Sequence, residues 1–308
     1  MSIIEKALNK ARNEKKKTTD PTDYLNEMGK SADELTIPTP AKETKTHIES
    51  TTNDNRLNTT LKKQIADIDW VHLNELGFIT PGATNTVAVE EYRNIKRPLV
   101  NNAFGKGSEG ITRSNLILIT SSLPGEGKTF TAINLALSIA NERDKQVLLI
   151  DGDVARPSVS KVLGIQTEPG LIDYLESDDV AFSDIQINTT MPGLRIIPAG
   201  KQHKYSTELL SSNKMAAFVD ELSSRYPDRI VIFDSPPLLA ATQGEILARL
   251  VGQVVLVVEA EKTMQSVVME SVDKLANCDV VLALFNKSKR NIDGDYYGYG
   301  YGYGQYTH

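Results

Sequence analysis

A glycine-rich turn between an apolar run and an amphipathic stretch is the feature that most constrains this chain. The turn reads Ser-Ser-Leu-Pro-Gly-Glu-Gly-Lys-Thr over residues 121–129. The run before it, residues 115–120, has the length and β-branched content of a buried strand, and the apolar residues of 130–140 recur every three or four positions. A strand, a turn ending in Gly-Lys-Thr and a helix, in that order, predict a phosphate-binding P-loop.

Each part of this loop has a chemical task when ATP and Mg²⁺ bind. Glycines let backbone N–H groups crowd around a phosphate, and the N-terminus of the next helix adds its positive dipole. Lys128 is expected to reach the β- and γ-phosphates, and the Thr129 hydroxyl to ligate Mg²⁺. Ser122 stands where the motif usually has its first glycine. The residues expected to surround the nucleotide are Pro124, Gly125, Glu126, Gly127, Lys128, Thr129 and Phe130.

From residue 115 onward, strand-like runs alternate with helical stretches. Several runs are almost entirely apolar, which is typical of strands buried on both faces of a parallel sheet and covered by helices. The chain is therefore expected to adopt an α/β fold, that of a P-loop NTPase with a mainly parallel, doubly wound sheet. The expected strands are 115–120, 146–151, 194–198, 229–234, 254–259 and 280–285.

Three aspartates lie at the ends of these strands. Asp151 and Asp153 come at the end of one apolar run, and Asp234 ends another. An Asp in this position commonly meets the Mg²⁺ of a P-loop nucleotide, although a lone Asp is more often a helix cap or turn residue. Asp151 and Asp153 alternate in direction along an extended backbone, so we expect one to face the metal and the other the nucleophile.

Composition narrows the class of protein. The 308-residue chain has a formal net charge of −6, which argues against nucleic acid as its main partner. Its single cysteine, Cys278, excludes an intrachain disulfide framework and fits a reducing compartment. No apolar run reaches the roughly 18 residues of a membrane span, and the first residues do not resemble a secretory signal. These features predict a soluble, cytoplasmic protein.

The N-terminal part of the chain differs in composition from the rest. Residues 2–17 are a candidate short helix, which either docks on a partner or an anionic membrane surface, or packs on its own domain. Residues 18–60 are polar and poor in aromatic residues, so a disordered linker is expected. The expected regions are the helix and linker (1–60), a helical lead-in (61–110), the P-loop domain (111–290) and a flexible tail (291–308).

The lead-in contains a second candidate helix, residues 87–96, which is expected to stop before Pro98. Glu90, Arg93 and Lys96 are spaced three apart and therefore share one face of that helix. This face is either a solvated charged surface or a contact surface.

The chain ends in alternating Tyr and Gly with no aliphatic residues, which predicts a mobile, exposed tail. One interpretation is a sticky low-complexity tail. Beside an ATP site with a spare carboxylate, the hydroxyls instead become candidate phosphoryl acceptors. Six of the 11 tyrosines lie here: Tyr296, Tyr297, Tyr299, Tyr301, Tyr303 and Tyr306.

Together, the P-loop, the Asp-Gly-Asp-Val-Ala-Arg-Pro of residues 151–157 and the Phe-Asp-Ser-Pro-Pro of 233–237 resemble the nucleotide motifs of bacterial tyrosine kinases. Members of that family end in a tyrosine cluster and govern the export or chain length of exopolysaccharide and capsule. The resemblance covers residues 86–308. The N-terminal Ser-Ile-Ile-Glu-Lys-Ala-Leu also resembles the autokinases encoded with exosortase-linked exopolysaccharide loci.

The resemblance implies an ATP-dependent tyrosine autokinase. It implies that Thr129, Asp153 and Asp234 organise Mg²⁺ and that Asp151 accepts the tyrosine proton; Arg156 would steady a phosphate or a neighbouring subunit.

The resemblance also implies partners. Glu90, Arg93 and Lys96 match the family's oligomerisation motif, with Lys in place of its last Arg, which loses a bidentate fork. A ring-like homo-oligomer, a membrane-bound polysaccharide chain-length or export protein as activator, and a tyrosine phosphatase are the implied partners. The implied location is the cytoplasm, with recruitment to the inner face of the membrane by that activator.

Two other functions remain open at this point. Partitioning and division-site ATPases share the sheet and the P-loop, but they carry a signature Lys at the position of Leu123 and leave the tyrosine tail without a role. An adaptor that only binds ATP is the third possibility.

Overall fold

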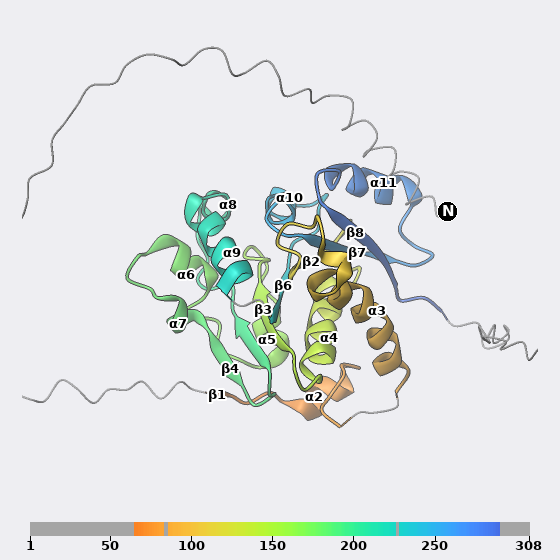
Figure 1. Cartoon of the computed structure of the whole chain (residues 1–308), viewed down its shortest axis with the longest axis horizontal. Helices are drawn as coiled ribbons and strands as arrows, with labels where there is room; N and C mark the ends of the chain where they lie inside the picture. Colours follow the sequence, from red (N-terminus) through yellow and green to blue (C-terminus); the bar gives the residue numbers. More distant parts are fainter. Residues whose placement is uncertain (1–64, 83–85, 226–227, 290–308) are drawn as a thin grey trace, which may run out of the picture.

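The strands of this chain form one mainly parallel sheet with helices on both faces (Figure 1). The structure is a computed structural model that describes residues 65–82, 86–225 and 228–289. The strand order is β1-β4-β5-β3-β6-β2-β7-β8, and only β4 and β5 pair antiparallel. The strands are β1 (Ile65–Ala66), β2 (Leu116–Ser121), β3 (Gln146–Asp151), β4 (Ile187–Thr189), β5 (Leu194–Ile197), β6 (Arg229–Asp234), β7 (Gln253–Glu259) and β8 (Val280–Asn286).

The six strands expected from the sequence are confirmed to within one residue at each end. The short β1 and β4 were not predicted, because neither has the run of apolar residues that marks a buried strand. The helices are α2 (Trp70–Glu75), α3 (Val87–Phe104), η1 (Lys106–Ser108), α4 (Lys128–Ala140), α5 (Val159–Leu163), α6 (Leu171–Glu176), α7 (Phe182–Ile185), α8 (Ser206–Leu210), α9 (Asn213–Arg225), α10 (Thr242–Ala248) and α11 (Gln265–Lys274).

Alternate residues of each central strand belong to two separate cores. In β2, Ile117 and Ile119 pack with α2, α3, α4 and α5, whereas Leu116 and Leu118 pack with the layer that contains α6, α9, α10 and α11. All six residues of β2 are buried, as expected for a strand covered on both sides. The α/β fold with a doubly wound, mainly parallel sheet is therefore confirmed.

Helix α3 continues through Pro98 to Phe104, so the expectation that it stops before Pro98 was wrong. A proline inside a helix costs about 3 kcal/mol, because it removes one N–H and its ring crowds the carbonyl four residues earlier. Beyond the proline, Leu99 is completely buried and Ala103 nearly so. Burial of these side chains against the sheet offsets the local cost, which a sequence pattern of caps and prolines does not reveal.

The lead-in elements share a core with the sheet. Leu73 of α2 and Val89, Tyr92 and Leu99 of α3 belong to the same cluster as the P-loop helix α4. The candidate helix at 2–17, the linker and the tyrosine tail all lie outside the described residues. Among the residues that are described, no helix is long and apolar enough to span a membrane.

Candidate active site

The P-loop follows β2 directly and ends in the first turn of α4. Gly125 and Gly127 have φ angles of 86° and 98°, a left-handed conformation that glycine adopts without steric cost. A Cβ atom on Gly127 would also lie 2.1 Å from Nδ2 of Asn286, so the residue has no room for a side chain. Ser122, in place of the usual first glycine, is buried and its Oγ accepts a 2.8 Å hydrogen bond from Ser271 of α11. The substitution therefore fixes the loop to a neighbouring helix.

The back of the loop is held by the side chain of Glu126, which is almost completely buried. Its carboxylate accepts a 2.7 Å hydrogen bond from the backbone N–H of Leu123 and another from the Thr263 hydroxyl. On the same side, Asn286 donates to the Glu126 carbonyl at 2.9 Å and Lys287 to the Gly125 carbonyl at 2.7 Å. The side chain of Glu126, a residue predicted to surround the nucleotide, thus fixes the loop.

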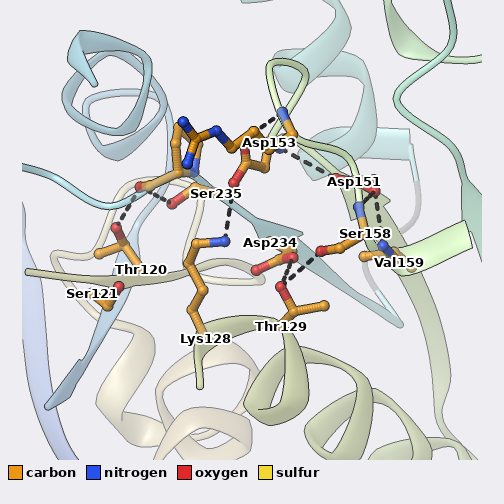
Figure 2. A network of polar contacts seen from close by, with 12 residues as sticks. Thr120, Ser121, Lys128, Thr129, Asp151, Asp153, Ser158, Val159, Asp234 and Ser235 are labelled. Carbon is orange, nitrogen blue, oxygen red and sulfur yellow. Dashed lines mark hydrogen bonds and ion pairs between the residues drawn. The ribbon is translucent and has the colours of Figure 1, made fainter. Parts of the chain in front are cut away.

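Lys128, the first residue of α4, points toward the end of β3 (Figure 2). Its Nζ lies 3.0 Å from Oδ2 of Asp153, and both side chains are largely buried. The other Asp153 oxygen accepts a 3.1 Å hydrogen bond from the backbone N–H of Arg156, whose own side chain is exposed. A phosphate placed in the loop would compete with Asp153 for Lys128.

Thr129 connects three elements of the site. Its hydroxyl donates a 2.6 Å hydrogen bond to Oδ2 of Asp234 and lies 3.0 Å from the Ser158 hydroxyl (Figure 2). Because Asp234 ends β6 and Ser158 immediately precedes α5, this pair of contacts joins the P-loop helix to two loops at the carboxyl edge of the sheet.

Asp151 lies beside Asp234, since the two are register partners on β3 and β6. Its Oδ2 accepts 3.0 Å hydrogen bonds from the backbone N–H groups of Ser158 and Val159, and its Oδ1 a longer one of 3.3 Å from Asp153 N. Burial, together with the negative charge of Asp234, raises the pKa of Asp151 to about 7.

Asp234 is completely buried, and this raises its pKa to about 6 although Lys128 and Thr129 act in the opposite direction. Its second oxygen, Oδ1, has no hydrogen-bond partner among the described residues. An unpaired carboxylate oxygen beside a threonine hydroxyl matches the oxygen ligands that Mg²⁺ prefers. No three His, Cys, Asp or Glu side chains in the described ranges could hold a metal ion by themselves. A Mg²⁺ here would therefore need oxygens from a nucleotide or water as well.

The structure thus brings Lys128, Thr129, Asp151, Asp153 and Asp234 together at one edge of the sheet. The ring of Phe130, a residue expected near the nucleotide, packs against Phe78, with centroids 4.7 Å apart. The six tail tyrosines lie outside the described residues.

The face of α3 that carries Glu90, Arg93 and Lys96 lies at the other end of α4. Glu90 and Arg93 form an exposed ion pair with each other. Lys96 is buried, donates a 2.7 Å hydrogen bond to the Ser138 carbonyl and pairs with Glu142 at 2.8 Å. The three side chains are therefore not equivalent, since Lys96 is used within the chain. Ten residues of helix, about 15 Å, separate Ser138 from Lys128.

Four residues that complete the site were not predicted from the sequence: Ser158, Thr263, Asn286 and Lys287. Ser158 follows the Asp-Gly-Asp motif after a short loop, and a serine just before a helix is a recognisable cap signal. The other three come from the turn after β7 and the end of β8, and only the folded chain brings them to the loop.

Comparison with known proteins places the chain in a family. The AAA domain family matches residues 114–288, more than half of the chain. Tyrosine-protein kinase YwqD of Bacillus subtilis is 31% identical over 229 residues, which cover 73% of this chain and 91% of that protein. The kinase domain of the Escherichia coli tyrosine kinase ETK superimposes with a TM-score of 0.61 at 25% identity, covering 78% of this chain and 89% of that domain.

Other relatives are much longer than this chain. Tyrosine-protein kinase ptk of Acinetobacter johnsonii is 33% identical over 180 residues, 58% of this chain and 23% of the relative. The match spans only about a quarter of the first relatives found, so the similarity is confined to one domain of those proteins. With its P-loop, its paired strand-end aspartates and its near full-length match to YwqD, the chain belongs to the family of bacterial tyrosine-protein kinases.

Proposed function

We propose that this protein is an ATP-dependent tyrosine kinase that phosphorylates the tyrosines at its own C-terminus. The observation that carries the proposal is the contact network in which Lys128 meets Asp153 and Thr129 meets Asp234, with Asp151 beside Asp234 on the neighbouring strand. A positively charged side chain, a Mg²⁺-type oxygen pair and a carboxylate of raised pKa are what transfer of a phosphoryl group to a tyrosine requires.

Lys128 and the P-loop N–H groups hold the phosphates. Lys128 exchanges its ion pair with Asp153 for the β- and γ-phosphates when ATP binds, which frees the Asp153 carboxylate. Thr129, Asp153 and Asp234 are the residues that would hold Mg²⁺, and the metal would supply positive charge to the phosphate oxygens.

Asp151 is the group that we assign to accept the proton of the acceptor tyrosine. A free tyrosine has a pKa near 10, so a positioned base is needed at neutral pH. Of the two oxygens of Asp151, Oδ1 accepts only the 3.3 Å contact from Asp153 N and is the easier one to release. Since Asp151 is completely buried, the loop that follows it must move before a tyrosine reaches this oxygen.

The last described residues of the chain lie near the P-loop. Strand β8 ends at Asn286, which contacts the P-loop, and Lys287 donates to the Gly125 carbonyl. The position of Asn286 and Lys287 at the P-loop is consistent with tyrosines that follow them in the sequence acting as acceptors in the same copy or in a neighbouring one.

The proposed setting and partners rest on the family resemblance of the motifs. They comprise exopolysaccharide biosynthesis or export, a membrane-bound chain-length or export protein as activator, a tyrosine phosphatase, and a cytoplasmic location at the membrane. Self-association into a ring would use Glu90 and Arg93, which are exposed on α3. Lys96 would contribute to it only indirectly, by fixing α3 to α4.

The test is incubation of dephosphorylated, purified protein with Mg-ATP labelled in the γ-phosphate. Label on tyrosine is the expected result. Release of labelled phosphate without protein labelling would instead indicate an ATPase of the partitioning type, and binding without turnover would indicate an adaptor.

A further inference from the structure

The edge strand β8 is more exposed than its composition suggests. Its sequence, Val-Val-Leu-Ala-Leu-Phe-Asn, is nearly all apolar, yet every residue of the strand retains some exposure and Phe285 is 63% exposed. The neighbouring β7 is buried along almost its whole length. Among the described residues β8 pairs only with β7, so its outer edge presents unpaired backbone groups. Natural proteins cover such edges, because an apolar, unpaired strand recruits other strands.

A groove of about 740 Å³ runs between this edge and helix α3. Residues 282–286 of β8 line it, opposite Ile95 and Pro98 of α3. Because Pro98 has no N–H, it cannot donate to the carbonyl of Asn94, and Asn94 is another residue that lines the groove. The groove therefore combines apolar walls with backbone groups able to bind an extended peptide.

We propose that the tyrosine-glycine tail of the same chain occupies this groove as an extended segment along β8. Lys287 and Ser288 line the end of the groove, and the tail, residues 291–308, begins three positions after Ser288 in the sequence. The 13 residues from Lys289 to Tyr301 can extend over roughly 40 Å, whereas the seven residues of β8 span about 23 Å. The tail can therefore turn back along the whole strand.

The tail sequence fits this position. In an extended segment, alternate residues share a face, so Tyr297, Tyr299, Tyr301 and Tyr303 lie on one side and the intervening glycines on the other. Tyrosine rings have an apolar body for the walls of the groove and a hydroxyl that can bond to backbone carbonyls. The glycine side has no side chains to hinder a close approach to a neighbouring element.

Two other occupants are conceivable, a second copy pairing edge to edge and the N-terminal residues 1–64. The tail is favoured because its tether begins at the groove, which gives it an effective concentration of order millimolar, well above that of a second copy in a micromolar solution. Residues 1–64 enter the fold through β1, at the opposite edge of the sheet from β8.

Hydrogen exchange on the full, dephosphorylated chain without nucleotide tests the proposal independently of kinase activity. The amides of interest are those of β8 that point away from β7. We expect them to exchange about tenfold more slowly in the wild type than in a Tyr299→Ser, Tyr301→Ser variant. The matched control, Tyr296→Ser with Tyr306→Ser, alters two tyrosines on the opposite side of the extended tail and should leave protection unchanged. On the groove side, Phe285→Ser should remove protection, whereas Met264→Ser, a similarly exposed residue at 68%, should not.

A nitroxide label identifies the copy that supplies the tail. It is attached at Tyr301→Cys in a chain whose only native cysteine is removed by Cys278→Ala. Broadening of β8 amide signals within the labelled chain, absent when unlabelled isotope-enriched chains are mixed with labelled ones, supports the proposal. Broadening only in the mixture, or β8 exchange that is the same in the tail variants and the wild type, overturns it.

Discussion

The Thr129 hydroxyl lies 2.6 Å from a carboxylate oxygen of Asp234, which ties the first turn of the P-loop helix to the end of a central strand. Because this hydroxyl gives its proton to Asp234, the Ser158 hydroxyl, 3.0 Å away, is the donor to the Thr129 oxygen. Ser158 also donates its backbone N–H to Asp151. A residue outside the expected set thus supports both a candidate metal ligand and the candidate base.

Ser158→Ala should raise the Mg²⁺ concentration needed for half-maximal activity about fivefold, since it removes one hydrogen bond worth about 1 kcal/mol. The backbone N–H to Asp151 is kept, so ATP binding without Mg²⁺ should not change. The matched control is Ser160→Ala in α5, because the buried Ser160 hydroxyl has no hydrogen-bond partner among the described residues. Equal Mg²⁺ requirements for both variants would show that Ser158 does not position Thr129.

Thr263→Val should weaken ATP binding about three- to tenfold, because the Glu126 carboxylate loses a donor and the P-loop loses part of its anchor. The substitution preserves side-chain shape, and Thr263 does not belong to the loop itself. Thr190→Val, on an exposed threonine beyond β4, is the control. Calorimetric titration with ATP measures both, and an unchanged affinity for Thr263→Val would rule out the anchoring role.

Asp151→Asn should stabilise the nucleotide-free protein at alkaline pH. The folded chain holds the Asp151 proton up to a pKa of about 7, whereas an unfolded Asp releases it near 3.8, so stability declines as pH rises between these values. Asparagine removes this decline, and we expect a gain of up to about 4 kcal/mol at pH 8 and none near pH 4.

Thermal denaturation across this pH range measures the effect. Asp178→Asn provides a control of opposite sign, since Lys214 lowers the pKa of that exposed carboxyl and its removal cannot stabilise the protein at pH 8. Parallel curves of Tm against pH for wild type and Asp151→Asn would contradict the raised pKa of Asp151. In the wild type, tyrosine phosphorylation should slow as pH falls below about 7, because a protonated Asp151 cannot accept a proton.

The two parts of the α3 face should respond differently to mutation. Glu90→Ala with Arg93→Ala removes an exposed ion pair worth less than about 1 kcal/mol, so Tm should hardly change while the particle mass falls. Lys96→Ala leaves Glu142 and the Ser138 carbonyl without their partner and should lower Tm by several degrees. Light scattering that gives the same mass for wild type and the Glu90, Arg93 double variant would exclude this face from assembly.

Much of the fold was predictable because its signals are local. Each of the six strands is marked by a run of apolar residues, and the P-loop by its Gly-Lys-Thr motif. Each of these segments forms the expected strand or loop. The aspartates could be assigned to one edge because parallel strands end together. The continuation of α3 past Pro98 could not be predicted, because it depends on Leu99 and Ala103 packing against distant residues.

The roles of individual side chains were less predictable for the same reason. Glu126 lies in the P-loop sequence, but its carboxylate is taken by Leu123 and by Thr263, which is 137 residues away. Lys96 has the spacing of a surface residue, yet Ser138 and Glu142 of a neighbouring helix region draw it inward. Only long-range contacts decide such cases.

The central claim is tested most directly by mapping phosphorylation by mass spectrometry on wild-type and Lys128→Met protein, both dephosphorylated and then incubated with Mg-ATP. Lys128 supplies the charge that follows the transferred phosphoryl group, and its loss should abolish activity without unfolding the chain. The account predicts phosphotyrosine among Tyr296, Tyr297, Tyr299, Tyr301, Tyr303 and Tyr306 in the wild type and none in the variant. Equal phosphotyrosine in the two samples, or none in the wild type, would contradict it.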